Sequence, residues 1–208
     1  RYTLQVSDSD GANPRTVLQS KQPILSPNWA PDGERLAYVS FENGKAEVFV
    51  QEMRSGRRNS VAAFKGLNSA PAWSPDGKRI LFTSDRGRLP QLYTMPSQGQ
   101  GRAERLTFEG NYNARGSYSA DGQTVTMVRG VEGKYRIAVL DLATGEGRAL
   151  TEGPLDESPS FAPNGKTIIY ARRKYNKEIL STVSVDGVRK QDIRSATGLV
   201  REPVWSPK

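Results

Sequence analysis

The sequence of 208 residues contains no cysteine and no histidine. Without cysteine the chain can form neither a disulfide nor a thiolate metal site. Without histidine it lacks a common metal ligand and the usual general base at neutral pH. Zinc centres and histidine-dependent catalytic triads are therefore excluded. No apolar run approaches the roughly 18 residues that a membrane-spanning helix needs, so we expect no direct membrane insertion.

The sequence also lacks the short motifs that mark common enzyme classes. It has no GxSxG elbow, no phosphate-binding glycine loop and no HExxH. The turn DSDG at residues 8–11 is similar to half of a calcium loop, but the glutamate that would complete such a loop is missing. Asp156 and Glu157 leave an incidental divalent ion as an alternative. We expect no catalytic residues, no cofactor and no metal site.

Positive charge exceeds negative charge, giving a formal net charge of +8. The densest basic runs are expected in turns between strands, and they comprise Arg54, Arg57 and Arg58, then Arg172, Arg173, Lys174 and Lys177. Scattered loop charges of this kind indicate a solvated surface, so we expect no nucleic-acid partner. The alternative is a basic docking surface that steers an acidic partner.

The most informative feature that is present is a repeat. Five segments share an aromatic residue followed by a small residue and a turn, and they read PNWAPDG, PAWSPDG, GSYSADG, PSFAPNG and PVWSPK. Their aromatic residues, Trp29, Trp73, Tyr118, Phe161 and Trp205, are separated by 44, 45, 43 and 44 residues. Such regular spacing indicates a repeat architecture. We expect these aromatics to pack in the core rather than to stack on a ligand.

Each repeat predicts four strands. A short apolar run follows each turn, as in residues 36–39 and 168–170, and such runs are typical of strands covered on both faces. A more alternating strand and a shorter one follow, while Pro and Asn/Asp-Gly suit the tight hairpin between the first two strands. One such sheet cannot cover both its apolar faces, but a ring of sheets can. The sequence therefore predicts an all-β fold, a β-propeller of about five four-stranded blades.

The two ends of the chain are expected to share the last blade. Residues 1–22 resemble the later part of a repeat, and residues 199–208 supply only an innermost strand. The other blades are expected at residues 23–66, 67–110, 111–154 and 155–198, so that residues 1–208 form a single propeller domain. The composite blade then lacks its second strand and leaves an open sheet edge. A homo-oligomer formed through this incomplete blade is an alternative to a monomer.

Several stretches carry a resemblance to a known family, namely YTLQVSDSDG, ILSPNWAPDGERLAYVSFENG, RLTFEGNYNARGSYSADG, IAVLDLATG, LDESPSFAPNGKTIIY and REPVWSP. In this order they resemble the propeller domain of the TolB family, the periplasmic component of the Tol-Pal system of Gram-negative bacteria. The family has six blades after an N-terminal α/β domain, whereas this sequence shows five repeats and no such domain. The segment APAWSPDGKRILFTSDRGRLPQLYTM joins the opening of one family blade to the body of the next. We therefore expect one blade fewer than in the family.

The resemblance implies a periplasmic protein that binds other proteins and is not an enzyme. Members of the family dock the peptidoglycan-associated lipoprotein, Pal, through the propeller. They contact TolA through an N-terminal segment that this sequence lacks, so TolA is not an expected partner. The loops that lead into the innermost strands gather on one face near the axis, and loops on a rigid scaffold often carry recognition. The partner-binding residues expected there are Ser26, Asn68, Ser69, Ala70, Asn111, Tyr112, Asn113, Arg115, Asp156, Glu157, Arg201 and Glu202.

Within this set, Ala70 matches a family position linked to lipoprotein docking, while Leu67 replaces a histidine that family members can carry. Two other functions stay open from the sequence. The same repeat signature occurs in propellers that gate or host hydrolases and lyases, and a fold alone does not decide function. A contracted or engineered ring that serves as a scaffold with no retained partner is the second alternative.

Overall fold

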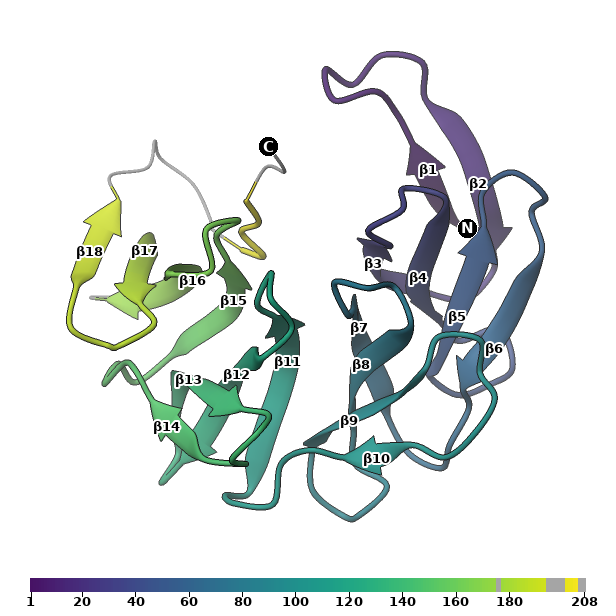
Figure 1. Cartoon of the computed structure of the whole chain (residues 1–208). Coiled ribbons are helices and arrows are strands. Elements are labelled where there is room, and N and C mark those ends of the chain that lie inside the picture. The colour runs from purple at the N-terminus through teal and green to yellow at the C-terminus, as the bar shows by residue number, and fades with distance from the viewer. Residues whose placement is uncertain (175–176, 194–200, 206–208) are drawn as a thin grey trace.

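The computed structural model describes residues 1–174, 177–193 and 201–205. The regular elements in this part of the chain are all strands, and no helix there is long and apolar enough to cross a membrane. Four four-stranded sheets and one two-stranded sheet follow one another along the chain. They are arranged around a common centre, with the first strand of each larger sheet innermost (Figure 1). The predicted all-β propeller arrangement is confirmed.

Each four-stranded sheet, here called a blade, is built from four consecutive antiparallel strands. Blade 1 contains β3 (Ile24–Trp29), β4 (Arg35–Ser40), β5 (Glu47–Glu52) and β6 (Arg58–Ala62). Blade 2 contains β7 (Asn68–Trp73), β8 (Arg79–Ser84), β9 (Gln91–Pro96) and β10 (Glu104–Arg105). Blade 3 contains β11 (Tyr112–Tyr118), β12 (Thr124–Val131), β13 (Lys134–Asp141) and β14 (Gly147–Ala149). Blade 4 contains β15 (Asp156–Phe161), β16 (Thr167–Lys174), β17 (Lys177–Ser184) and β18 (Lys190–Ile193).

The number of complete blades is four, so the prediction of about five four-stranded blades is wrong. The N-terminal residues form a two-stranded sheet, in which β1 (Tyr2–Val6) pairs with β2 (Arg15–Ser20). Residues 201–205 form no strand, and the rest of the expected closing strand, residues 199–200 and 206–208, lies outside the described residues. The fifth unit is not a complete blade, because β1 and β2 are the two strands that pair in this sheet among the described residues.

Tight hairpins join the first two strands of each blade, as the Asp-Gly and Asn-Gly pairs predict. Gly33 and Gly77 have φ angles of 69° and 67°, which glycine adopts without the strain that a side chain would add. The preceding aspartate closes each turn: Asp32 Oδ1 accepts a hydrogen bond from the Glu34 backbone N–H at 2.9 Å, and Asp76 Oδ1 accepts one from Lys78 at 3.0 Å. Backbone geometry and side-chain chemistry therefore specify the same hairpin.

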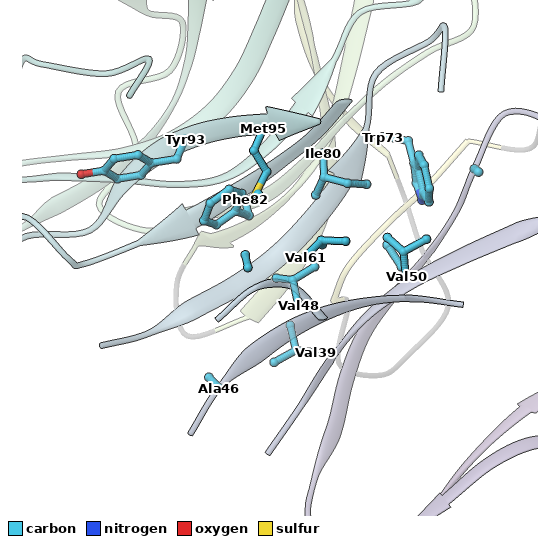
Figure 2. Close-up of a cluster of buried hydrophobic side chains, with 13 residues drawn as sticks. Val39, Ala46, Val48, Val50, Val61, Trp73, Ile80, Phe82, Tyr93 and Met95 are labelled. Carbon is cyan, nitrogen blue, oxygen red and sulfur yellow. The ribbon is translucent and has the colours of Figure 1, made fainter. Parts of the chain in front are cut away.

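The hydrophobic core lies between the blades rather than inside one sheet. Figure 2 shows the cluster between blades 1 and 2, where Val48 and Val50 of blade 1 approach Trp73 and Phe82 of blade 2. Similar clusters lie between blades 2 and 3 and between blades 3 and 4, and a smaller one joins the β1–β2 sheet to blade 1. The second strand of each blade contains at least four consecutive buried residues. Stacking of sheets therefore covers both faces of a blade, which stabilises the ring by hydrophobic burial.

One expected turn is instead part of a hairpin of long strands. Arg172, Arg173 and Lys174 are the last residues of β16, and Lys177 is the first residue of β17. The two strands pair from Thr167 with Ser184 out to Lys174 with Lys177. The cross-strand ladder, which the polar sequence does not reveal, extends these strands beyond the apolar run.

Candidate partner-binding site at the centre of the ring

Five residues at the same position of the repeat adopt the same unusual backbone conformation. Ser26, Ala70, Arg115, Ser158 and Glu202 each lie three residues before the repeat aromatic and have φ angles between 48° and 55°. In the four blades the pairing of the innermost strand with its neighbour shifts register across this residue, as in a β-bulge. Positive φ is costly for a residue with a side chain, so the surrounding ring must hold these five bulge residues in place.

The residue after each bulge residue is proline in four of the five repeats. In the remaining repeat, the third along the chain, it is Gly116. Proline has no backbone N–H, so it suits a place where the inner edge of the sheet has no strand beyond it. At Gly116 the reason is space, because an added Cβ would lie 2.7 Å from Leu81 Cδ2 of blade 2. Bulges and prolines together prevent the inner edges from pairing with other strands. The edges therefore stay open around the axis.

The bulge residues surround a small central cavity of about 170 Å³. Its other lining residues come from the same inner strands, among them Pro27, Pro71, Gly116 and Pro159. Arg115 and Glu202 are the charged residues among those that line it. The cavity is therefore a narrow space walled by small side chains, with one cation and one anion.

The two charged residues of the cavity bind each other. Arg115 Nη1 donates a hydrogen bond to Glu202 Oε1 at 3.0 Å and lies 3.4 Å from Ser158 Oγ. The Arg115 backbone N–H donates to Thr83 Oγ1 of blade 2 at 3.0 Å. Both side chains of the ion pair are largely exposed, so the pair contributes little to stability. It does place residues 201–205 at the centre of the ring, where a fifth innermost strand would begin.

Three of the expected site residues are buried and support the loops instead of facing solvent. The side-chain amide of Asn68 donates to the carbonyl oxygens of Phe64 at 2.8 Å and Ala46 at 3.2 Å. The amide of Asn113 donates to the Glu109 carbonyl at 2.7 Å. Asp156 occupies the equivalent place in blade 4 and is equally buried. The two amides fix the loops that lead into the innermost strands, and none of the three side chains reaches the surface.

The carboxyl group of Asp156 has a less favourable environment than the two amides. Neither of its oxygens makes a hydrogen bond of good geometry in the described part of the chain, although the Thr151 side chain and the Gly153 backbone N–H lie near enough to favour its ionised form, and Arg172 Nε lies 3.7 Å away. Burial raises the pKa of this carboxyl above its ordinary value of 3.8. We therefore assign Asp156 a structural place in the loop.

The remaining expected residues lie around the bulge residues. Asn111 and Arg201 are exposed, while Ser69, Tyr112 and Glu157 are half-buried. The Tyr112 ring packs edge-on against Tyr135 with centroids 5.1 Å apart. The ring of strands thus brings Ser26, Ala70, Arg115 and Glu202 together at one cavity and leaves the others beside it. Their role in binding a partner stays a prediction.

Four exposed apolar side chains on the same face, here called the apolar rim, were not expected from the sequence. They are Leu67, Leu89, Phe108 and Tyr135, and Phe108 is 73% exposed. Backbone hydrogen bonds tie their loops together, since the Asp85 N–H donates to the Leu67 carbonyl and the Asn113 N–H to the Pro90 carbonyl. The alternating direction of successive strands was the signal that could have predicted their position. In an antiparallel blade the loop between the second and third strands emerges at the same end as the loop into the first strand.

Comparison with known proteins gives a consistent result along the whole chain. The family profile described as the TolB beta propeller domain matches residues 1–81 and again residues 71–208. The two matches overlap at residues 71–81, within the segment expected to join two family blades. A Tol-Pal system protein TolB from Xanthomonas campestris pv. campestris (strain B100) is 42% identical over 252 aligned positions, which cover 100% of this chain and 57% of that protein. The alignment is 44 positions longer than the chain, about the length of one repeat.

Solved structures agree. The crystal structure of TolB from Acinetobacter baumannii is 41% identical with a TM-score of 0.62, and the match covers 100% of this chain and 63% of that one. A putative TolB from Agrobacterium tumefaciens has a TM-score of 0.67 over 91% of this chain and 87% of that one, and its 18% identity shows a shared fold alone. The chain spans a little over half the length of the curated relatives it matches. On these matches and on its fold, the chain belongs to the TolB β-propeller family.

Proposed function

We propose that this chain is a periplasmic, non-enzymatic binding platform of the Tol-Pal system that docks the peptidoglycan-associated lipoprotein. The observation that carries the proposal is the face built around the bulge residues, on a chain of the TolB family. This face presents the central cavity, the Arg115–Glu202 pair and the apolar rim. Its partner, location and role in the cell envelope follow from the relatives and are proposals for this chain.

The chemistry of the face suits contact between proteins. Protein interfaces combine exposed apolar side chains, which gain from burial, with a few polar groups that fix orientation. The apolar rim supplies the first, and Ser26, Ser158 and Arg115 around the cavity supply the second. The backbone hydrogen bonds between loops hold these groups in place before binding, which lowers the ordering cost of association.

The same face offers little to catalysis. The charged groups of the cavity neutralise each other, and no set of three or more His, Cys, Asp or Glu side chains in the described residues is grouped to hold a metal ion. Serine side chains line the cavity, yet the sequence provides no histidine to activate one. A binding role is therefore the function that these residues support best.

Calorimetric titration with the soluble periplasmic domain of the lipoprotein tests the proposal. Substitution Ala70→Arg keeps the backbone strain of the bulge unchanged but fills the cavity mouth, so we expect affinity to fall about tenfold or more. Arg115→Ala removes the cation and should also weaken binding.

Val188→Ser serves as the control, because Val188 is exposed in the β17–β18 turn, away from the apolar rim. This variant should bind like the parent chain. Absence of any binding by the parent chain overturns the proposed function, and unchanged binding by both cavity variants moves the site away from the ring centre.

A further inference from the structure

An arginine of blade 1 is bound at the interface with blade 2, beside the turn that follows each innermost strand. The guanidinium carbon of Arg35 lies 4.6 Å from the centroid of the Trp73 ring. Arg35 Nε donates a hydrogen bond to Asp32 Oδ2 at 2.9 Å, and Nη2 donates to the Gly77 carbonyl of blade 2 at 3.1 Å. A carboxylate, a carbonyl and an aromatic ring therefore form one binding site for a guanidinium group.

The same three groups recur between blades 2 and 3. They stand 44 or 45 residues after their counterparts in the repeat, and they are Asp76, Tyr118 and Gly122. Gly122 has a φ angle of 71°, close to the 67° of Gly77, so the same kind of turn presents its carbonyl group. The second interface therefore contains a carboxylate, an aromatic ring and a carbonyl at equivalent positions of the repeat.

The arginine of blade 2 is bound elsewhere. Arg79 stands at the repeat position of Arg35, but its Nε donates to Thr94 Oγ1 at 3.2 Å and its Nη2 to Glu104 Oε2 at 2.9 Å. Both partners belong to the outer strands β9 and β10 of its own blade. Among the described residues Asp76 forms no ion pair, and its hydrogen bonds, from Ser74 Oγ and the Lys78 N–H, both go to Oδ1.

A cavity of about 440 Å³ lies at this place between blades 2 and 3. Asp76 and Gly122 line it together with an apolar wall, which consists of Leu106, Leu142 and the Tyr118 ring. The phenol ring is smaller than the indole of the first interface, which leaves more open space. The residues that line the cavity lie between positions 74 and 142, far from both ends of the chain, and the structure describes each of them.

The charge of the cavity favours a cation. Asp76, Glu104 and Asp121 line it with one basic residue, Arg79, which pairs with Glu104. A serine hydroxyl donates to the carboxylate of Asp76 and another to that of Asp121, and these bonds lower the pKa of both groups. Both are therefore ionised at neutral pH and attract positive charge to the cavity, although the chain as a whole has a net charge of +8.

We propose that this cavity is a binding site for a guanidinium group on an apolar stem, the chemistry of an arginine side chain. The Asp76 carboxylate and the Gly122 carbonyl accept hydrogen bonds from the guanidinium, as Asp32 and Gly77 do in the first interface. The Tyr118 ring stacks on its planar face, and the two leucines cover the stem. A guanidinium fits better than an ammonium, because its planar fork reaches a carboxylate and a carbonyl at once.

The site is separate from the face proposed to dock a partner. It lies beside the turns that follow β7 and β11, whereas the bulge residues lie near the start of these strands. Substitutions in the guanidinium site should therefore leave binding at the centre of the ring unchanged. The inference does not depend on the proposed function.

Titration of N-acetyl-arginine amide into the complete chain tests the site, followed by the methyl NMR signals of Leu106 and Leu142. We expect both signals to shift with a dissociation constant of about 1 mM, typical of a small ligand with few contacts. The corresponding citrulline amide has nearly the same shape but no positive charge, so it should bind at least about tenfold more weakly. The lysine amide should fall between them.

Two matched variants assign the contacts. Asp76→Asn removes the carboxylate from the cavity and should weaken binding of the arginine amide at least about tenfold. Asp32→Asn changes the same repeat position in the interface that Arg35 already occupies, so it should leave binding unchanged. Arg79→Gln removes a competing cation from the cavity wall and should strengthen binding.

Free arginine distinguishes the two sources of this chemistry. Tighter binding of the amide would identify the ligand as part of a polypeptide, and tighter binding of the free amino acid would identify a small molecule; either result supports the site. Unshifted Leu106 and Leu142 signals, or equal binding of the arginine and citrulline amides, overturn the proposal. Binding by a folded Asp76→Asn chain at parental affinity overturns it as well.

Discussion

Asp156 occupies the place in blade 4 that Asn68 takes in blade 2 and Asn113 takes in blade 3, at the start of an innermost strand. The two amides donate to loop carbonyls, whereas an ionised carboxylate has no proton to donate. Burial raises the pKa of the folded-state carboxyl above 3.8, so the folded protein holds this proton more tightly than the unfolded chain does. The stability that protonation provides is fully present below pH 3.8 and is lost as pH rises through the folded-state pKa.

The substitution Asp156→Asn is therefore expected to stabilise the protein at pH 7 by about 1 kcal/mol, the usual net value of one hydrogen bond. The gain should shrink as pH falls through the raised folded-state pKa towards 3.8, where the parent carboxyl is itself protonated in the folded protein. Thermal unfolding of parent and variant across this pH range measures the difference. Equal melting temperatures at pH 7 would contradict a buried carboxyl whose pKa is raised by burial.

Asp192 provides the matched control on the same blade. The Ser181 hydroxyl donates to its Oδ1 at 2.8 Å, and this bond, with Lys174 nearby, lowers the pKa of Asp192. Its ionised form therefore contributes stability that is present above pH 3.8 and lost as pH falls through the lower folded-state pKa. Asp192→Asn should destabilise the protein at pH 7, with a pH trend opposite to that of Asp156→Asn.

At the scale of single residues the sequence predicts position better than role. The spacing of the aromatic residues also places the five bulge residues, since Ser26, Ala70 and Arg115 follow one another at 44 and 45 residues. Their shared positive φ is hidden because Ser, Ala, Arg and Glu have little chemistry in common. The proline or glycine that follows each of them is the visible trace of the bulge. Asn68 and Asn113 each donate to the carbonyl four residues earlier in their own loop, and the apolar pattern of the sequence does not reveal their burial.

Individual elements depend on whether a preceding sheet covers them, and the two tryptophans Trp29 and Trp73 test this directly. Trp73 lies between blades 1 and 2 with the Arg35 guanidinium 4.6 Å above its ring. Trp73→Ala should lower the free energy of unfolding by about 3–5 kcal/mol, because it leaves a cavity between two sheets. Trp29→Ala should cost less than about half as much, because nearly half of its side chain already contacts solvent.

Chemical denaturation of the two variants gives the comparison. Both substitutions remove the same side chain from the same repeat position, so differences in residue type cancel. Similar losses of stability would mean that Trp29 is covered in solution, by a second copy or by the ends of the chain.

Strands were predictable where an apolar run is covered on both faces, as for β4, β8, β12 and β16. The number of complete blades was not predictable, because the repeat pattern does not show which strands pair, and in the described residues β1 pairs with β2 alone. The repeat count alone gives five, since it counts PVWSPK as a blade. The structure gives four, because residues 201–205 form no strand. Glu202 nevertheless keeps the backbone conformation of the other bulge residues.

For the whole molecule, stability follows the order of contacts around the ring. Blades 2 and 3 are covered by a blade on each side, whereas among the described residues the core of the β1–β2 sheet packs against blade 1 alone. In arrays of repeats each unit gains stability from its neighbours, so units with one neighbour open more readily. The Arg115–Glu202 pair across the centre is too exposed to change this order.

Native-state hydrogen exchange should therefore show a gradient around the ring. Backbone amides of β8 and β12, which lie in the doubly covered blades, should exchange slowest. Amides of β1 that pair with β2 should exchange at least about tenfold faster, because the small sheet opens without unfolding the rest. Uniform protection of all these amides would mean that the ring unfolds as one unit and that its ends are joined in solution.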